Sequence, residues 1–185
     1  MKGITLILVL IMIAGVVGIS GCTDSGAAGS QKTFSDGSIK FNYSEDFENA
    51  TSPGNIISGD KSWITVGFLG NNATGTAIDI AKNKETKDPN GARQVTDAAT
   101  TTSNGGVSTG EILSHTTETN PNGITIFKSI HTLKDPDTGE TVKYIDFYFK
   151  DKKGVVYSIS VYNAESEYQD VSDTADMIFK SLSLN

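Results

Sequence analysis

Cysteine is almost absent from this sequence: Cys22 is the only one among 185 residues. A single thiol cannot form a disulfide within the chain, so the fold must rest on a hydrophobic core, which a chain of this length can supply. Histidine occurs only as His115 and His131, and neither has a cysteine partner. This pattern argues against a zinc site.

Basic residues are also scarce. The chain has 15 Lys and Arg against 22 Asp and Glu, a formal net charge of −7. Nucleic acids and anionic bilayers are bound through clustered Lys and Arg that displace counterions. The composition therefore argues against a nucleic-acid partner and against electrostatic attachment to a membrane.

The position of Cys22 points to another form of attachment. Lys2 precedes an apolar stretch over residues 4–19, and Ile19-Ser20-Gly21-Cys22 closes it with small residues where a signal peptidase must fit the chain. This is the pattern of a lipobox, so we predict a lipoprotein signal peptide over 1–21 and lipid attachment at Cys22. An uncleaved N-terminal anchor is the alternative. Either reading predicts an extracytoplasmic protein on the outer face of the membrane.

The remainder predicts one domain. Residues 22–33 are small and polar without an apolar period, which is typical of a flexible spacer. A single α+β domain is expected over 34–185. Period-two patterns predict strands at 38–43, 63–69, 111–117, 124–133, 142–150 and 155–162, with turns at 120–123, 135–139 and 151–154 between the last four. Residues 76–82 fit a strand or a helix, and the strand is favoured because a turn precedes it.

Two helices are expected. One covers 90–103, with Asn90 as the N-cap and a stop at Asn104-Gly105-Gly106. The other is amphipathic, with apolar residues three and four apart near the C-terminus: Tyr168, Val171, Ala175, Ile178 and Leu182.

The strand over 142–150 predicts which face of the sheet is buried. Ile145, Phe147 and Phe149 share one face and are expected in the core beneath the C-terminal helix, with Asp146 outside. The predicted fold is a single-layer antiparallel β-sheet of six to seven strands with two helices packed on it, both on one face.

The layout resembles a known family. Phe34-Ser35-Asp36-Gly37-Ser38-Ile39-Lys40-Phe41-Asn42-Tyr43, a central meander and a final helix ending Ile178-Phe179-Lys180-Ser181-Leu182 are similar to the PsbP-like (Mog1/PsbP) α/β domain found in many small surface lipoproteins. Tyr43-Ser44 and Phe47 depart from the Tyr-Pro and Trp that this family often has. The resemblance implies a scaffold for docking to larger assemblies and no shared catalytic residues.

Two motifs suggest chemistry that their context does not support. Gly106-Val107-Ser108-Thr109-Gly110 has the G-x-S-x-G spelling of a nucleophile elbow, but a strand-like segment follows it instead of a helix. The stretch from Asp135 to Glu140 clusters carboxylates, yet its glycine and its twelfth residue, Asp146, do not fit a calcium loop. We therefore predict no catalytic residues, no metal, no cofactor and no enzyme.

Two surface features are also predicted. Asn42, Asn49 and Asn72 each begin an Asn-x-Ser/Thr triplet that could accept an N-glycan, and Asn72 lies in the best predicted turn. Tyrosines on the outer side of the sheet could form an interaction surface, although pairing that only stabilises the sheet is the alternative. These are Tyr144, Tyr148, Tyr157 and Tyr162.

Two functions follow from these observations. The first is a lipid-anchored extracytoplasmic interaction module that docks on another cell-envelope component, held to the membrane by the lipid on Cys22. It predicts a contiguous exposed apolar or aromatic patch. The second is a small-ligand-binding lipoprotein with a pocket between helix and sheet, which predicts polar groups converging among apolar walls.

Overall fold

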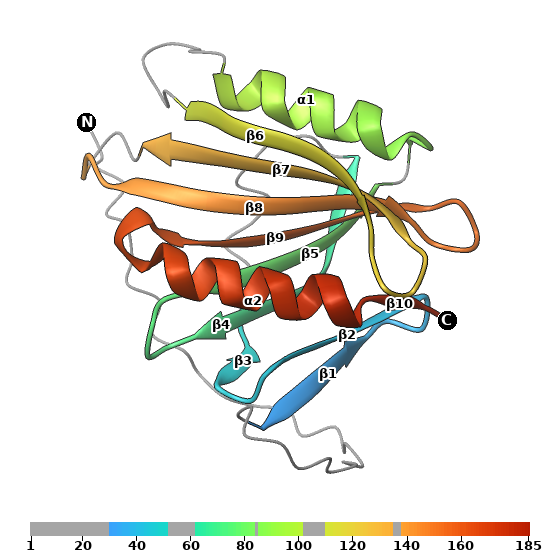
Figure 1. Ribbon diagram of the computed structural model, residues 1–185, viewed down its shortest axis with the longest axis horizontal. Coiled ribbons are helices and arrows are strands. Elements are labelled where there is room, and N and C mark those ends of the chain that lie inside the picture. Colours follow the sequence, from blue (N-terminus) through green and yellow to red (C-terminus); the bar gives the residue numbers. More distant parts are fainter. Residues whose placement is uncertain (1–29, 52–61, 84, 102–109, 135–137) are drawn as a thin grey trace.

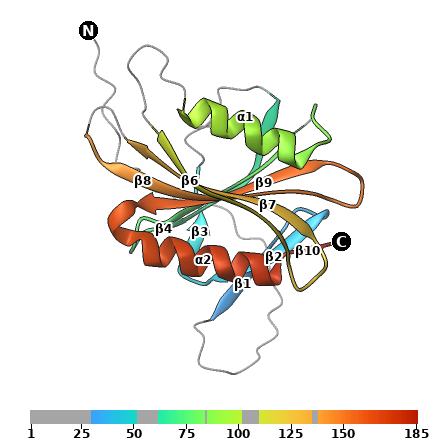
Figure 2. The same cartoon turned by 45° about the horizontal axis from the view of Figure 1, so that its top comes forward.

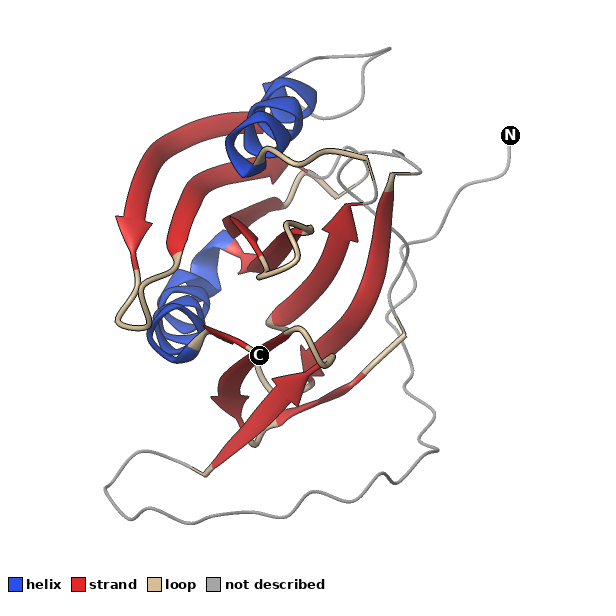
Figure 3. Ribbon diagram, turned by 90° about the vertical axis from the view of Figure 1, so that its right-hand side faces the viewer, coloured by secondary structure: helices blue, strands red, loops and turns tan. Residues whose placement is uncertain are grey.

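The computed structural model describes residues 30–51, 62–83, 85–101, 110–134 and 138–185. Within these ranges two antiparallel sheets carry two α-helices (Figure 1). The large sheet has the strand order β3-β4-β5-β9-β8-β7-β6, and the small sheet the order β1-β2-β10. The strands of the large sheet are strongly twisted and bent (Figure 3).

Most elements lie where the sequence predicts them. The strands are β1 (Gln31–Ser35), β2 (Ile39–Ser44), β3 (Phe47–Asn49), β4 (Trp63–Asn71), β5 (Ala77–Asn83), β6 (Gly110–Thr119), β7 (Thr125–Lys134), β8 (Thr141–Lys150), β9 (Val156–Ala164) and β10 (Ser183–Leu184). The helices are α1 (Pro89–Thr101), a 3-10 turn η1 (Glu165–Glu167) and α2 (Tyr168–Ser181). The α+β class and the sheet with two helices are confirmed.

The main core lies under α2, as predicted. Ile145, Phe147 and Phe149 are at most 2% exposed, and they pack with the apolar stripe of α2 and with the small sheet. Burying side chains of this size contributes about 1.5 to 3 kcal/mol each. The hydrophobic period of α2 therefore identified its buried face correctly.

The placement of α1 corrects the prediction that both helices share one face. Helix α1 lies over β6, β7 and β8, whereas α2 lies over β2, β8 and β9. Tyr148 packs with Ala92 of α1, while its neighbour Phe147 packs under α2. Because neighbouring strand residues face opposite sides, the two helices cover opposite faces (Figure 2). Asp146, predicted outside, is therefore fully buried under α1.

The start of α1 also differs from the prediction. The Asp88 Oδ1 atom accepts a hydrogen bond from the Asn90 N–H (3.1 Å), and the Asp88 carbonyl accepts one from the Ala92 N–H (3.0 Å). Asp88 is thus the N-cap, and Pro89 takes the first helical position, where a missing N–H costs nothing.

One boundary and the burial of one strand differ from the prediction. Strand β1 begins at Gln31, so residues 31–33 belong to the fold and not to the predicted spacer. Strand β4, expected to be deeply buried, is mostly half-buried.

In the described residues no helix is both long and apolar enough to span a membrane. Cys22, residues 1–29 and the predicted stop at Asn104-Gly105-Gly106 lie outside the described residues.

Candidate functional site

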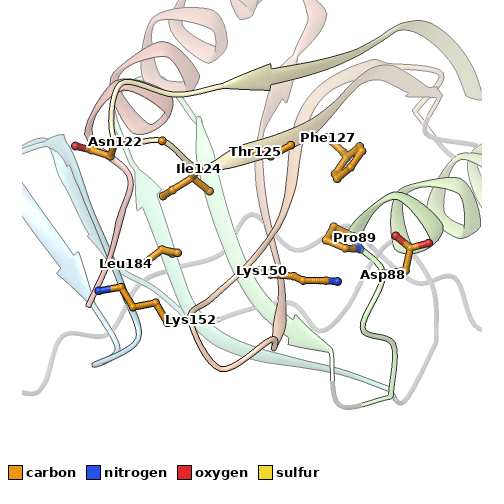
Figure 4. Close-up of a pocket in the computed structure, with 10 residues that line it drawn as sticks. Asp88, Pro89, Asn122, Ile124, Thr125, Phe127, Lys150, Lys152 and Leu184 are labelled. Carbon is orange, nitrogen blue, oxygen red and sulfur yellow. The ribbon is translucent and has the colours of Figure 1, made fainter.

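A groove of about 590 Å³ opens at one end of the large sheet (Figure 4). The N-terminus of α1, the β6–β7 turn, the ends of β7 and β8, the β8–β9 turn and β10 meet there. The lining residues are Asp88, Pro89, Asn122, Gly123, Ile124, Thr125, Phe127, Lys150, Lys152 and Leu184.

The β6–β7 turn is held in place by the C-terminus of α2. The Asn120 side-chain amide donates to the carbonyls of Phe179 (3.1 Å) and Leu182 (2.7 Å), and the Asn122 amide donates to the Leu182 carbonyl (2.9 Å). Carbonyls at a helix end lack intrahelical partners, so these side chains satisfy them. The turn is thereby fixed, and Ile124 after it is buried in the groove wall.

The opposite wall comes from the β8–β9 turn. The Asp151 Oδ1 atom accepts hydrogen bonds from the backbone N–H groups of Lys153 and Val155, both at 2.8 Å. Such bonds within a turn fix its backbone. Lys150 and Lys152, on either side of Asp151, are therefore presented from an ordered segment.

The two lysines carry the groove's available charge. Asp88 uses its carboxylate to cap α1, and neither Lys150 nor Lys152 forms an ion pair with any residue that the structure describes. In Figure 4 the Lys150 side chain extends toward Pro89, and Lys152 lies beside Leu184. Both side chains are exposed, so the ammonium groups can contact a solute.

Apolar surface lies between these cations. Pro89 and Ile124 are buried in the wall, and Phe127 and Leu184 are half-buried. An apolar wall with a few polar groups is the usual form of a small-molecule site. The arrangement suits a molecule with an apolar body and an anionic group.

A second cluster of functional groups lies under α1. One row of side chains crosses five strands on this face, from β5 through β9, β8 and β7 to β6. Its members are opposite one another in the strand register: Asp79, Ser160, Asp146, Ser129 and His115.

Asp97 connects α1 to this row. Its Oδ1 atom accepts a hydrogen bond from the Ser129 hydroxyl (2.8 Å), and its Oδ2 atom lies 2.6 Å from Arg93 Nη1 and 3.0 Å from His115 Nε2. The buried face of α1 is therefore largely polar, and it packs on a polar sheet surface.

A histidine and a carboxylate meet in the interior beside this row. His131 Nδ1 lies 3.4 Å from Asp146 Oδ2, and both side chains are fully buried. The two atoms are within ion-pair distance but do not have hydrogen-bond geometry. Among the described residues, neither ring nitrogen of His131 nor Asp146 Oδ1 has a hydrogen-bond partner. The His131 ring stacks on Tyr144, which stacks on Tyr162, with centroids 4.8 Å apart in each pair.

Burial perturbs these groups. Desolvation, with the nearby charge of Asp146, raises the pKa of Asp79 to about 6. Desolvation also raises the pKa of Asp146, while His131 and hydrogen bonds from Ser160 and Tyr148 oppose that rise. Both buried carboxyl groups therefore keep their protons to a higher pH than exposed carboxyl groups do.

Perturbed carboxyl groups often mark functional sites, but these ones lie away from the groove. The Tyr148 hydroxyl contacts Asp146 Oδ2 (3.4 Å), and Phe127 packs against the Tyr148 cluster while lining the groove. These two rings separate the groove from the carboxyl groups. A solute does not reach the fully buried Asp146 and His131, so the groove, and not this cluster, is the candidate binding site.

The predicted tyrosine surface is wrong. Tyr144, Tyr148 and Tyr157 are at most 5% exposed, and Tyr162 is half-buried. Tyr157 also lies on the other face, in the α2 core, with its hydroxyl donating to Asp36 Oδ2 at 2.8 Å. Burial raises the pKa of each of these four hydroxyls, that of Tyr157 to about 12.

The other predicted sites have varied positions. Asn72 is exposed in the turn after β4, Asn49 is exposed in β3, and Asn42 is half-buried with its amide donating to Gln31. Glycosylation stays a prediction at all three.

Most of the G-x-S-x-G motif and residues 135–137 lie outside the described residues, and Gly110 is the first residue of β6. The described residues hold no cluster of three metal-ligating side chains.

The groove residues escaped sequence reasoning. Lys150 and Lys152 flank Asp151 at a predicted turn, and Asp88 precedes the predicted start of a helix; charged residues are ordinary in both places. The pairing of strands β6 to β9 brings these turns to one end of the sheet, but no local pattern in the sequence indicates that the start of α1 and β10 meet them there.

No protein-family model matches the sequence, and no curated protein matches it significantly. Among solved structures, the chain is similar to cyanobacterial PsbP (CyanoP) from Synechocystis sp. PCC 6803, with a TM-score of 0.56 and 14% identity over 89% of this chain and 98% of that one. The PsbP-like fold expected from the sequence is confirmed.

Two weaker likenesses have TM-scores too low to carry an argument. One is the Ran-binding protein Mog1p of Saccharomyces cerevisiae, with a TM-score of 0.47 and 15% identity over 85% of this chain and 96% of that one. The other is LpqN of Mycobacterium tuberculosis, involved in cell envelope biogenesis, with a TM-score of 0.48 and 14% identity over 84% and 91%.

Proposed function

We propose that this protein is a lipid-anchored extracytoplasmic binding protein, and not an enzyme, whose groove takes a small molecule with an apolar body and an anionic group. The observation that carries the proposal is that Lys150 and Lys152, which form no ion pair with the described residues, lie beside the apolar surface of a groove of about 590 Å³. This volume is typical of small-molecule sites.

Docking on an envelope component was the first function expected from the sequence, and it stays a prediction. It requires a contiguous apolar patch, yet Val95 and Leu113 are the large hydrophobic side chains exposed among the described residues. Two such side chains fall short of a patch of several hundred Å². The groove is the better supported feature.

The groove is tested with 1-anilinonaphthalene-8-sulfonate, a fluorescent probe that joins apolar rings to a sulfonate. We expect saturable one-to-one binding, and weaker binding of the uncharged 1-anilinonaphthalene. Lys150→Ala and Lys152→Ala should each weaken sulfonate binding about fivefold, because an exposed ion pair contributes about 1 kcal/mol.

Lys153→Ala is the matched control. Lys153 is exposed on the same turn and does not line the groove, so this variant should bind the probe like the parent protein. Equal weakening by all three substitutions would show that the probe responds only to net charge and would overturn the proposed site.

The membrane anchor has its own test. Cys22→Ser should release the protein from the membrane fraction of the native host, because the serine hydroxyl cannot form the thioether to lipid. Fractionation followed by immunoblotting measures the distribution, and a mass shift of the parent protein by a diacylglyceryl group supports the attachment. Retention of Cys22→Ser in the membrane would favour an uncleaved N-terminal anchor.

A further inference from the structure

Strand β6 is a long exposed edge of the large sheet. In the described part of the chain it pairs only with β7. Seven of its ten residues are exposed, whereas β3, at the opposite edge, has only three residues. Edge strands present unpaired N–H and C=O groups that can pair with another chain, and most proteins shorten or cover them.

A second groove, of about 300 Å³, lies beside this edge on the face carrying α2. Its floor is apolar and its rim is mostly acidic. The lining residues are Ile145, Phe147, Tyr168, Ala175 and Phe179 in the apolar part, with Glu118, Lys128, Ser172, Asp173 and Asp176 around it.

Carboxylates outnumber cations on the rim. Lys128 lies 3.9 Å from Glu118, and Asp176 pairs with Lys180 at 2.6 Å. Asp173 accepts a hydrogen bond from the neutral amide of Gln169 (2.8 Å) and forms no ion pair among the described side chains. Asp173 is therefore the rim carboxylate without a cationic partner among the described side chains, and in a chain of net charge −7 it favours a positively charged group.

This shape fits a long basic side chain. The methylene stem of Lys or Arg packs on apolar surface while its charged end reaches polar groups at the rim. Such a residue would come from a strand added to β6, because alternate residues of a strand face the same side of the sheet. Ser114, Thr116 and Glu118 already face this side, opposite Ile130, Lys128 and Ile126 of β7.

We propose that β6 binds an extended basic segment of a partner protein by strand addition, with a Lys or Arg side chain in the groove beside α2. A β-bulge between Ile112 and Ser114 interrupts the regular ladder, so the pairing segment is Ser114–Thr119. Strand addition draws affinity from main-chain hydrogen bonds and specificity from alternate side chains. It needs no large apolar patch.

A second copy of the chain is the less suitable occupant. Self-pairing would bring two molecules of net charge −7 together, each with Glu118 in its pairing segment. Like charges that face each other across strands are destabilising.

The test uses a fluorescein-labelled, blocked peptide of about eight residues, which exceeds a typical strand, alternating lysine with threonine or valine. Fluorescence anisotropy should show saturable binding by the full chain. Glutamate in place of lysine should abolish binding. Two further peptides are N-methylated on alternate backbone amides, one on the odd-numbered and the other on the even-numbered residues. One of these two peptides should bind at least about tenfold more weakly, because its methyl groups block the hydrogen bonds to the edge of β6.

Protein variants separate the groove from general acidity. Asp173→Asn with Asp176→Asn should weaken peptide binding several-fold. Glu165→Gln with Glu167→Gln removes the same charge from η1, whose residues are exposed and do not line the groove, and should leave binding unchanged.

Two results would overturn the proposal. Unchanged affinity for both N-methylated peptides would show attraction by charge alone. Concentration-dependent dimerisation of the parent protein in sedimentation, abolished by Thr117→Pro, would make β6 an interface between copies of this chain. Neither outcome bears on the binding of the anionic probe at Lys150 and Lys152, so this inference and the proposed function fail independently.

Discussion

His131→Leu should lower the free energy of unfolding by about 3 to 5 kcal/mol at pH 8. His131 Nδ1 lies 3.4 Å from Asp146 Oδ2, and both side chains are fully buried. Removing His131 leaves a carboxyl group in the interior that must either ionise without a partner or keep its proton in alkaline solution. Both outcomes cost stability.

The pH dependence of this loss identifies its cause. Without His131, the already raised pKa of Asp146 rises further. A carboxyl group whose pKa is raised in the folded state stabilises the fold in acid, and this contribution is lost as pH rises through the folded pKa. The variant should therefore be closer to the parent protein at pH 5 than at pH 8.

Two further variants serve as controls for the effect of His131→Leu on stability. His131→Leu with Asp146→Leu should recover most of the loss, because two apolar residues of similar volume replace the pair. His115→Leu removes the only other histidine, which is partly exposed beside Asp97, and should cost about 1 kcal/mol or less. Urea unfolding followed by the fluorescence of Trp63, the sole tryptophan, measures all of them. Equal stability of His131→Leu and the parent at both pH values would contradict the account.

Local patterns in the sequence predicted most of the elements correctly. Phe147 and Phe149 were placed in the core because strand residues alternate between faces, and α2 was recognised because its apolar residues recur at helical spacing. The turns after Asn120 and Asp151 were expected because these side chains bond to the backbone two residues on. Information of this kind lies within a few residues of each position.

The same patterns failed on the other face of the sheet. Alternation shows that Asp146 and Phe147 face opposite sides, but it does not show whether a second helix covers the side with Asp146. The polar residues on that side suggested solvent, and α1 lacks an obvious apolar stripe because it buries Thr96, Asp97 and Thr100. Here a polar helix face covers a polar sheet face. Polar residues alternate along the strand in the same way whether they face solvent or this interior, so the sequence does not distinguish the two.

Asp79→Asn should have the opposite effect to the loss of His131, and should raise the free energy of unfolding by about 2 kcal/mol at pH 8. Asp79 Oδ1 is buried and has no hydrogen-bond partner in the part of the chain that the structure describes. Burial and the charge of Asp146 raise its pKa from 3.8 to about 6, against a hydrogen bond from the Ile80 backbone N–H. Each pKa unit of such a shift corresponds to about 1.4 kcal/mol of stability. Because Asp79 is partly exposed, solvent screening reduces the total to the value given above.

The sign follows from proton binding. Between about pH 4 and pH 6 the folded protein retains the Asp79 proton that the unfolded chain releases, so the stability supplied by this group falls as pH rises through that range. Asparagine is neutral at every pH, so the fall should flatten in the variant and the two proteins should converge near pH 4. Glu48→Gln, at an exposed position in β3, should leave the pH profile unchanged. A gain of the same size at pH 4 and pH 8 would show that amide packing, and not the buried charge, determines the stability at this position.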